Sequence, residues 1–201
     1  MVLITGMIFS LLLVTISYSV NRHLLGAKLV VDCYQLALTA SCVVVLALIG
    51  ESVVNPLYTA WFGQKLWVYR ILPLHDGNVS ALGVIIWAAY GVHLYFTRQT
   101  LINKLPNAMN NSAGIAIIIG FEAPFICEVL GNLLFLNVLG DYYAYYLPGD
   151  VFHLTSFQVV PIYMLCLLLG LTILGTLERL PRKFVLPPAL FSAGLAYLVT
   201  G

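Results

Sequence analysis

The chain has 201 residues, of which 61% are hydrophobic and only 8% are charged, and its formal net charge is +1. Soluble domains carry roughly 25% charged residues, so this composition excludes an ordinary soluble surface. The absence of a basic run or of a large net charge also excludes a nucleic-acid footprint. We therefore expect the partners to be membrane lipids, a lipophilic small molecule or other membrane subunits, with no nucleic acid.

Six apolar stretches predict membrane-spanning helices, because about 20 helical residues cross the roughly 30 Å hydrocarbon core of a bilayer. In chain order they cover residues 2–20, 29–54, 79–96, 113–139, 155–177 and 185–200. The fold class expected is therefore all-α, a polytopic membrane bundle forming a single transmembrane domain over residues 1–201. The four cysteines lie inside these stretches and are expected to be small buried apolar residues; they are Cys33, Cys42, Cys127 and Cys166.

Lysine and arginine are unequally divided between alternate loops. Two of them, Lys65 and Arg70, lie in the second and fourth loops, and seven lie in the other three, namely Arg22, Lys28, Arg98, Lys104, Arg179, Arg182 and Lys183. Cytoplasmic loops collect positive charge during insertion. This split predicts that both termini, and the second and fourth loops, lie on the non-cytoplasmic side.

The second and fourth loops are rich in aromatic residues. The segment 55–76 carries Tyr58, Trp61, Phe62, Trp67 and Tyr69, and the segment 140–150 carries Tyr142, Tyr143, Tyr145 and Tyr146. Aromatic side chains with one polar end favour the boundary between lipid and water. We expect both loops to lie along the membrane surface or to fold back as lids.

A duplicated pattern links the two halves of the chain. Glu, Asn and Gly recur with identical spacing, as Glu51-x3-Asn55-x7-Gly63 and as Glu128-x3-Asn132-x7-Gly140. Each copy continues through an aromatic run and Leu-Pro to a Ser or Thr, with His and Asp in between. The predicted copies cover about residues 29–97 and 113–177, and they run in the same direction through the membrane, as in folds with parallel repeats.

This symmetry predicts a polar pocket at the outer face. Its candidate catalytic residues are Glu51, Glu128, Asn55, Asn132, His75, Asp76, Asp150 and His153, and its candidate substrate contacts are Trp67, Tyr69, Tyr142, Tyr146 and Trp87. A carboxylate within a span is costly and is a functional hypothesis by default. Loop Asp and His residues are equally often caps or surface groups.

Two further ionisable residues lie in predicted spans outside this set. Glu122 precedes Pro124 and is six residues before Glu128 in the same span. It is expected to be a proton partner of the site or a group that stabilises a kink. His93 lies toward the inner end of the third span, where hydrogen-bonded packing is the expected role.

Acid–base chemistry on a lipid is the first functional hypothesis. A carboxylic acid in a low-dielectric pocket can remain protonated near neutral pH and then protonate a double bond, while its partner accepts a proton from water. Aromatic faces would shield the resulting cation. On this hypothesis the protein is a lyase of the hydratase type, an isomerase or a cyclase.

The second copy resembles the core of the carotenoid hydratase family of membrane proteins. The residues that carry the resemblance are Glu128-Val-Leu-Gly131, Gly140-x-Tyr142-x3-Tyr146-Leu147 and Val159-Val160-Pro161, and the first copy is similar through Glu51, Phe62-Gly63, Trp67-x-Tyr69, Leu72 and 82–87. The resemblance covers about a third of the chain. Members of that family add water to the end of a long polyene, so the resemblance implies an isoprenoid substrate.

Two other functions remain open from the sequence. Glu51, His75, Glu128 and His153 could hold iron, manganese or zinc, although the Glu-x-x-His spacing of helical-bundle metal sites is missing. Alternatively the chain is a transporter or a small subunit of a larger membrane complex, with aromatic residues around a pigment or quinone. The sequence leaves the identity of any cofactor unknown.

Overall fold

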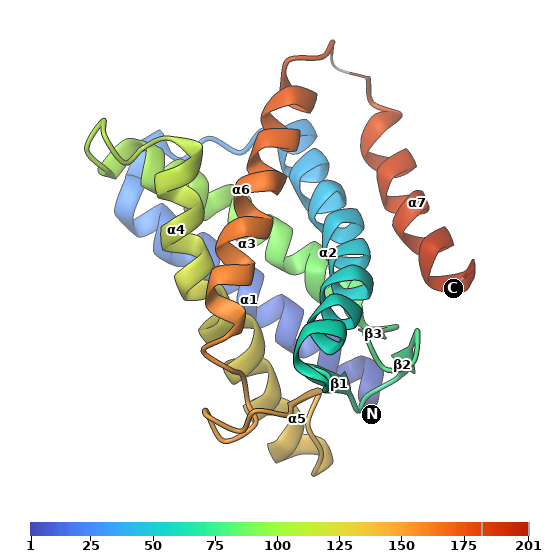
Figure 1. Cartoon of the computed structure of the whole chain (residues 1–201). Helices are drawn as coiled ribbons and strands as arrows, with labels where there is room; N and C mark the ends of the chain where they lie inside the picture. Colours follow the sequence, from blue (N-terminus) through green and yellow to red (C-terminus); the bar gives the residue numbers. More distant parts are fainter. Residues whose placement is uncertain (182, 201) are drawn as a thin grey trace.

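The computed structural model describes residues 1–181 and 183–200. Arg182, one of the cations counted for the predicted orientation, lies outside the described residues. The chain is predominantly helical, as predicted (Figure 1). Its helices are α1 (Val2–Leu25), α2 (Cys33–Phe62), α3 (Gly83–Lys104), α4 (Ser112–Ala123), α5 (Leu130–Leu139), α6 (Val159–Glu178) and α7 (Leu186–Thr200). A 3-10 turn, Gly26–Lys28, follows α1, and a π-helical turn, Pro124–Val129, joins α4 to α5.

Four helical stretches are long and apolar enough to cross a membrane, judged by length and composition. They are Val2–Lys28, Cys33–Phe62, Ser112–Leu139 and Val159–Glu178. The predicted third span corresponds to α3, which is long enough but carries more polar residues, and the predicted sixth span corresponds to the shorter apolar helix α7. These four stretches are compatible with an integral membrane protein.

Two predicted helix starts are wrong because the residues concerned form extended structure. Val79–Ser80 is strand β3, which pairs with β2 (Pro73–Leu74) across a tight turn, so α3 begins only at Gly83. Thr155 forms a bridge with Val151, so α6 begins at Val159. Pro161 is compatible with this start, because the N–H groups of a first helical turn have no partner within the helix.

The two aromatic loops are joined by a short antiparallel ribbon that the sequence did not predict. Strand β1 (Trp67–Tyr69) pairs with β4 (Ala144–Tyr146), with Trp67 opposite Tyr146 and Tyr69 opposite Ala144. Each strand follows a helix that ends at a left-handed glycine, Gly63 (φ 73°) after α2 or Gly140 (φ 74°) after α5. The ribbon therefore connects the ends of the two matched helices.

Small residues allow the helices to approach closely. A Cβ added at Gly91 of α3 would lie 2.6 Å from the Cα of Ala40 in α2, and one added at Gly120 of α4 would lie 2.7 Å from the Cα of Met164 in α6. In Figure 1, α6 lies in front of α3 and beside α2, and α7 lies along the outer side of α2. The two closely packed pairs, α2 with α3 and α4 with α6, meet where α6 contacts α2.

The cysteines divide into two pairs. Cys42 and Cys127 are buried, as predicted, whereas Cys33 and Cys166 are exposed. The prediction of burial was wrong for the latter two because an apolar stretch does not reveal which face of its helix packs inward. An exposed apolar face is expected where lipid replaces a protein neighbour.

Candidate functional site

Two buried asparagines attach the ribbon to the helices. Asn55 of α2 donates from Nδ2 to the carbonyl of Trp67 (2.8 Å) and accepts from the amide of Leu66 (2.9 Å). Asn132 of α5 does the same with one residue of the other strand, donating to the carbonyl of Ala144 (2.8 Å) and accepting from its amide (3.0 Å). Both asparagines therefore use their side-chain amides to position the ribbon.

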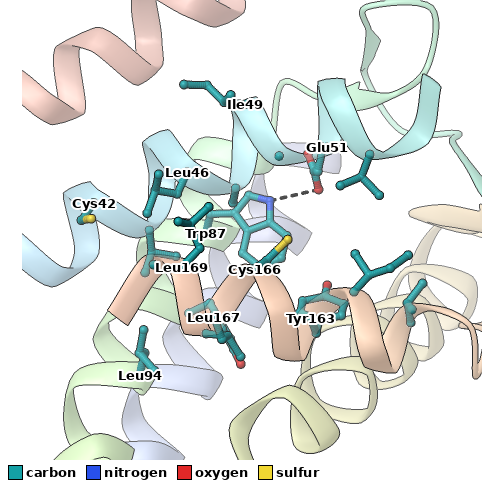
Figure 2. Close-up of a pocket in the computed structure, with 18 of the residues that line it drawn as sticks. Cys42, Leu46, Ile49, Glu51, Trp87, Leu94, Tyr163, Cys166, Leu167 and Leu169 are labelled. Atoms are coloured by element: carbon teal, nitrogen blue, oxygen red, sulfur yellow. Dashed lines mark hydrogen bonds between the residues drawn. The ribbon is translucent and has the colours of Figure 1, made fainter. Parts of the chain in front are cut away.

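Glu51 lies one turn before Asn55 and is buried beneath the ribbon, with 8% of its surface exposed. Its Oε1 accepts hydrogen bonds from the Tyr69 hydroxyl and from the indole Nε1 of Trp87 (3.1 Å), the second of which Figure 2 marks. Its Oε2 is buried and has no hydrogen-bond partner among the described residues. A buried polar atom without a partner costs about 1–3 kcal/mol, so this oxygen is available to a bound molecule.

Glu128 lies in the π-helical turn and is 9% exposed. Its Oε1 accepts a hydrogen bond from the Tyr163 hydroxyl of α6 (2.8 Å), and its Oε2 accepts one from the hydroxyl of Thr155. The hydroxyl of Tyr146 in β4 also hydrogen-bonds to this carboxylate. Glu128 is therefore surrounded by donors, as suits an ionised acceptor.

Both glutamates line one cavity of about 370 Å³. Most of its wall is apolar and comes from α2 and α6, as Figure 2 shows for Leu46, Leu167 and Leu169. Along α2 the wall runs from Thr39 to Val54, which at 1.5 Å per helical residue is about 22 Å. The polar groups concentrate near the end that lies under the ribbon.

The cavity has a mouth between α2 and α6. Several residues of its wall are also exposed on the outside of the molecule, including Ile49 (43%), Val53 (49%) and Leu169 (60%). These side chains belong to helices that are long and apolar enough to cross a membrane. The mouth would therefore open sideways onto lipid.

The tyrosines of the ribbon remain hydrogen-bond donors over a wide pH range. Burial, followed by the charge of Glu51, raises the pKa of Tyr69 well above its ordinary value. Burial, followed by the charge of Glu128, does the same to the pKa of Tyr146. Both phenols are therefore protonated at neutral pH and can share their protons with the carboxylates.

The loop residues of the first copy lie outside the cavity wall. The His75 ring stacks on Tyr197 of α7, with centroids 5.2 Å apart. Asp76 is an exposed carboxylate that pairs with Lys65 at 2.6 Å, and hydrogen bonding to that ammonium group lowers the pKa of Asp76. Both residues have the positive φ angles of the tight turn before β3. Their positions serve the turn and its contact with α7.

The loop residues of the second copy have local partners as well. The Oδ2 atom of Asp150 accepts hydrogen bonds from the Ser156 hydroxyl (3.1 Å) and from the Phe157 amide (2.9 Å). The His153 ring stacks on Tyr145 and its Nδ1 contacts the carbonyl of Tyr146 at 2.6 Å. Asp150 fixes the chain just before α6, and His153 braces the strand that carries Tyr146.

The predicted metal ligands are not gathered into one cluster. Glu51 and Glu128 share the cavity, whereas His75 and His153 lie on opposite loops with ring partners of their own. Within residues 1–181 and 183–200, no three His, Cys, Asp or Glu side chains are grouped as a metal site would require. The structure gives the metal hypothesis no ligand set.

Four of the five predicted substrate contacts line the cavity, namely Trp67, Tyr69, Trp87 and Tyr146. Tyr142 does not; it is partly buried, and its hydroxyl donates to the carbonyl of Phe152 (3.2 Å). The sequence placed Tyr142 in the site because aromatic residues in one run look equivalent. Tyr142 precedes β4 (Ala144–Tyr146), the strand that pairs with β1, so it lies outside the ribbon that covers the cavity.

Three residues near the two glutamates were not among the predicted site residues. The sequence identified Thr155 only as the hydroxyl residue that follows Leu-Pro in the second copy, yet its hydroxyl donates a hydrogen bond to Glu128. Tyr163 and Tyr90 were missed because a lone tyrosine in an apolar helix is typical of packing. Both lie on the cavity side of their helices, α6 and α3. The hydroxyls of Thr155 and Tyr163 reach Glu128 from distant parts of the chain, and no local spacing indicates such a contact.

No family model matches the chain, and no curated protein or solved structure matches it either.

Proposed function

We propose that this protein is an integral membrane enzyme that carries out acid–base chemistry on one end of a lipophilic chain, with an isoprenoid or a related lipid as substrate. The observation that carries the proposal is the position of two buried glutamates at one end of a long apolar cavity. A buried ionisable group is costly, and two in one cavity point to chemistry and not to packing.

The lining of the cavity favours a substrate with an extended hydrocarbon chain. The wall is about 22 Å long along α2 and is apolar away from the glutamates. The exposed residues at its mouth, such as Ile49 and Leu169, would allow a lipid to enter sideways from the membrane. The reactive end would then lie beneath the ribbon, beside Trp87 and Tyr69.

The hydrogen bonds assign different roles to the two acids. Glu51 has both donors on Oε1, so Oε2 can carry a proton toward the substrate. Glu128 has donors on both oxygens and acts as the carboxylate base. Glu51 would protonate a carbon of a double bond, and the cation formed would be held against aromatic faces.

Two outcomes are then open to the cation. Water can add to it and lose a proton to Glu128, which gives a net hydration. Alternatively an adjacent carbon can lose a proton to Glu128, which moves the double bond. Both routes consume one proton from Glu51 and deliver one to Glu128, so the atoms and charges balance, and the hydration route agrees with the family that the sequence resembles.

The same proposal includes the arrangement in the membrane. Six spans, comprising the four candidate stretches together with α3 and α7, would place both termini on the non-cytoplasmic side. The parallel hydrogen bonds of Asn55 and Asn132 support an internal repeat. Labelling of single cysteines at Gln64 and Ala108 with a membrane-impermeant maleimide tests the orientation; reaction of both from the same side would overturn it.

The test of the chemistry is product analysis. Cells that make isoprenoids would express the wild-type protein, Glu51→Gln or Glu128→Gln, and lipids bound to the purified protein and in the membrane would be identified by mass spectrometry. Removing a catalytic acid or base costs about 10²–10⁴-fold in rate, so we expect the altered lipid to disappear in both variants. Asp141→Asn, which changes an exposed loop carboxylate, is the matched control.

The outcomes separate an enzyme from a carrier. Loss of product with retained lipid in the two glutamate variants supports the proposal. An unchanged lipid that binds equally to the wild-type protein and to both variants would refute the enzymatic role and favour a carrier or a subunit that holds a pigment.

A further inference from the structure

A second buried polar group lies deeper in the helical bundle. His93 of α3 is 5% exposed, and its Nε2 lies 3.0 Å from Oε1 of Glu122 in α4. Its Nδ1 lies 2.9 Å from the Ser17 hydroxyl of α1. The Ser17 hydroxyl accepts a hydrogen bond from Nδ2 of Asn21, and Oδ1 of Asn21 accepts a hydrogen bond from the hydroxyl of Thr100. Three helices therefore contribute to a hydrogen-bonded chain that the site described above does not use.

The chain of polar groups and the cavity are connected along one face of α3. Trp87, Tyr90, His93, Thr97 and Thr100 follow one another at spacings of three or four residues, which places them on one stripe of a helix. The first of them bonds to Glu51 and the third to Glu122. From Trp87 to His93 the helix rises about 9 Å.

Tyr90 lies between the two polar groups. Its ring contacts Trp87 and His93, with centroids 5.7 and 5.5 Å away, and it lines the same cavity as Glu128. The residue is 2% exposed and lines the cavity, and its hydroxyl has no hydrogen-bond partner among the described residues. A fully buried phenol without a partner is unusual.

The π-helical turn begins two residues after Glu122 and carries Glu128. The amide of Leu130 bonds to the carbonyl of Phe125, five residues back, after Pro124 has interrupted the regular pattern. One extra residue per turn rotates everything beyond it by roughly 100°. The turn thus sets the relative direction of Glu122 and Glu128, and such turns occur frequently at functional sites.

The surroundings of the cavity create a need for a proton path. Its mouth faces the apolar surface between α2 and α6, and the ribbon covers its polar end. Lipid supplies no protons. One turnover of the proposed chemistry leaves Glu51 as a carboxylate and Glu128 as an acid, so a proton must leave Glu128 and another must reach Glu51 before the next turnover.

We propose that His93 and Glu122 form a proton-exchange pair for the Glu51/Glu128 site, with Tyr90 as the link between them. After a turnover, protonated Glu128 gives its proton to the Tyr90 hydroxyl oxygen while Tyr90 gives its own hydroxyl proton to neutral His93. Glu128 returns to the carboxylate, His93 becomes an imidazolium that Glu122 stabilises, and Tyr90 is restored. The reverse sequence supplies a proton to the site.

This exchange is gated. The Tyr90 hydroxyl bonds to neither partner in the structure, so it must rotate, or a water must enter beside it, before a proton can pass. Around His93 the facing groups are Ser17 from α1, Tyr90 and Thr97 from α3, and Glu122 from α4. The described residues thus provide one carboxylate, Glu122, within ion-pair distance of this histidine.

The inference rests on the proposed chemistry only in naming the site that is supplied. Its test therefore measures proton exchange and does not depend on catalytic activity. Protein in lipid nanodiscs would be transferred from H₂O to D₂O, and the shift of the infrared carbonyl band of the site's protonated carboxylic acid would be followed with time. That band is assigned by its loss in Glu51→Gln or Glu128→Gln.

We expect Tyr90→Phe, His93→Gln and Glu122→Gln each to slow this exchange about tenfold or more, since a positioned proton-transfer group contributes about 10²–10⁴-fold. The matched controls are His23→Gln, at an exposed histidine, and Tyr142→Phe, at a tyrosine outside the cavity wall, and both should exchange like the wild type. Backbone amide exchange, read from the same spectra, reports any general loosening.

Equal carboxyl exchange in all five variants would overturn the relay, as would a wild-type spectrum without the assigned band. Slowed carboxyl exchange with unchanged amide exchange supports it. If the relay passes this test while the Glu51→Gln and Glu128→Gln variants still release product, then the proposed function is refuted and the relay is not.

Discussion

Replacement of Asn55 by alanine tests how the ribbon is held over the cavity. Asn55 is fully buried, and its side chain satisfies the Leu66 amide, the Trp67 carbonyl and the Asn78 side chain. Alanine would leave the first two backbone groups without this partner. At about 1–3 kcal/mol for each buried unsatisfied group, the free energy of unfolding should fall by about 2–6 kcal/mol.

The measurement is a denaturing-detergent titration followed by tryptophan fluorescence, for which the neighbouring Trp67 is a natural reporter. Asn132→Ala should behave like Asn55→Ala, because its amide makes the equivalent bonds to Ala144 and a further one to Leu154. Asn137→Ala is the matched control on α5: it is exposed and bonds only within its helix, so a change within about 0.5 kcal/mol is expected. Equal stability of all three variants would refute the anchoring role.

Two other predictions concern helix packing and alkaline pH. Gly91→Ala should lower the free energy of unfolding by about 1–3 kcal/mol, because its Cβ would lie 2.6 Å from Ala40, whereas Gly175→Ala, with no atom within 4 Å, should not; thermal melts of both check this. Burial, followed by the charge of Glu51, raises the pKa of Tyr69 in the folded state. The protonated Tyr69 phenol therefore contributes fully to the free energy of unfolding below the ordinary tyrosine pKa of about 10, and this contribution is lost as the pH rises above that value. The melting temperature should fall less steeply above about pH 10 in Tyr69→Phe than in the wild type or in Tyr142→Phe; parallel curves would contradict the assignment.

The helical part of the fold follows from the sequence because it depends on local composition. Apolar stretches of about 20 residues locate α1, α2, α4 to α5 and α6. The predicted end of the second span at Val54 was wrong, because α2 continues through the first residues of the predicted loop to Phe62. The ends were harder to predict. Val79–Ser80 looks like the start of a span, yet it pairs with a strand six residues earlier, and a pairing of two residues leaves no periodicity to detect.

The candidate site was predictable where the two copies agree and not where tertiary contacts decide. The repeat identified Glu51 and Glu128, and both line the cavity. It also selected His75 and Asp150. The His75 ring stacks on Tyr197, and the Asp150 carboxylate accepts a hydrogen bond from the chain just before α6. Tyr163 could not be found in this way, because its hydroxyl meets Glu128 only after α6 has packed against the π-helical turn.

The differences between the copies carry as much information as their likeness. Ser80 and Thr155 occupy matching positions, but Ser80 donates to the carbonyl of Ile71 whereas Thr155 donates to Glu128. The position that matches Tyr163 in the first copy is Ala88, which has no hydroxyl to offer Glu51. Two carboxylates with identical surroundings would have no reason to take opposite roles. A symmetric scaffold with unequal donors can keep one acid ready to release a proton and the other ready to accept one, which is the arrangement that acid–base chemistry on a neutral hydrocarbon requires.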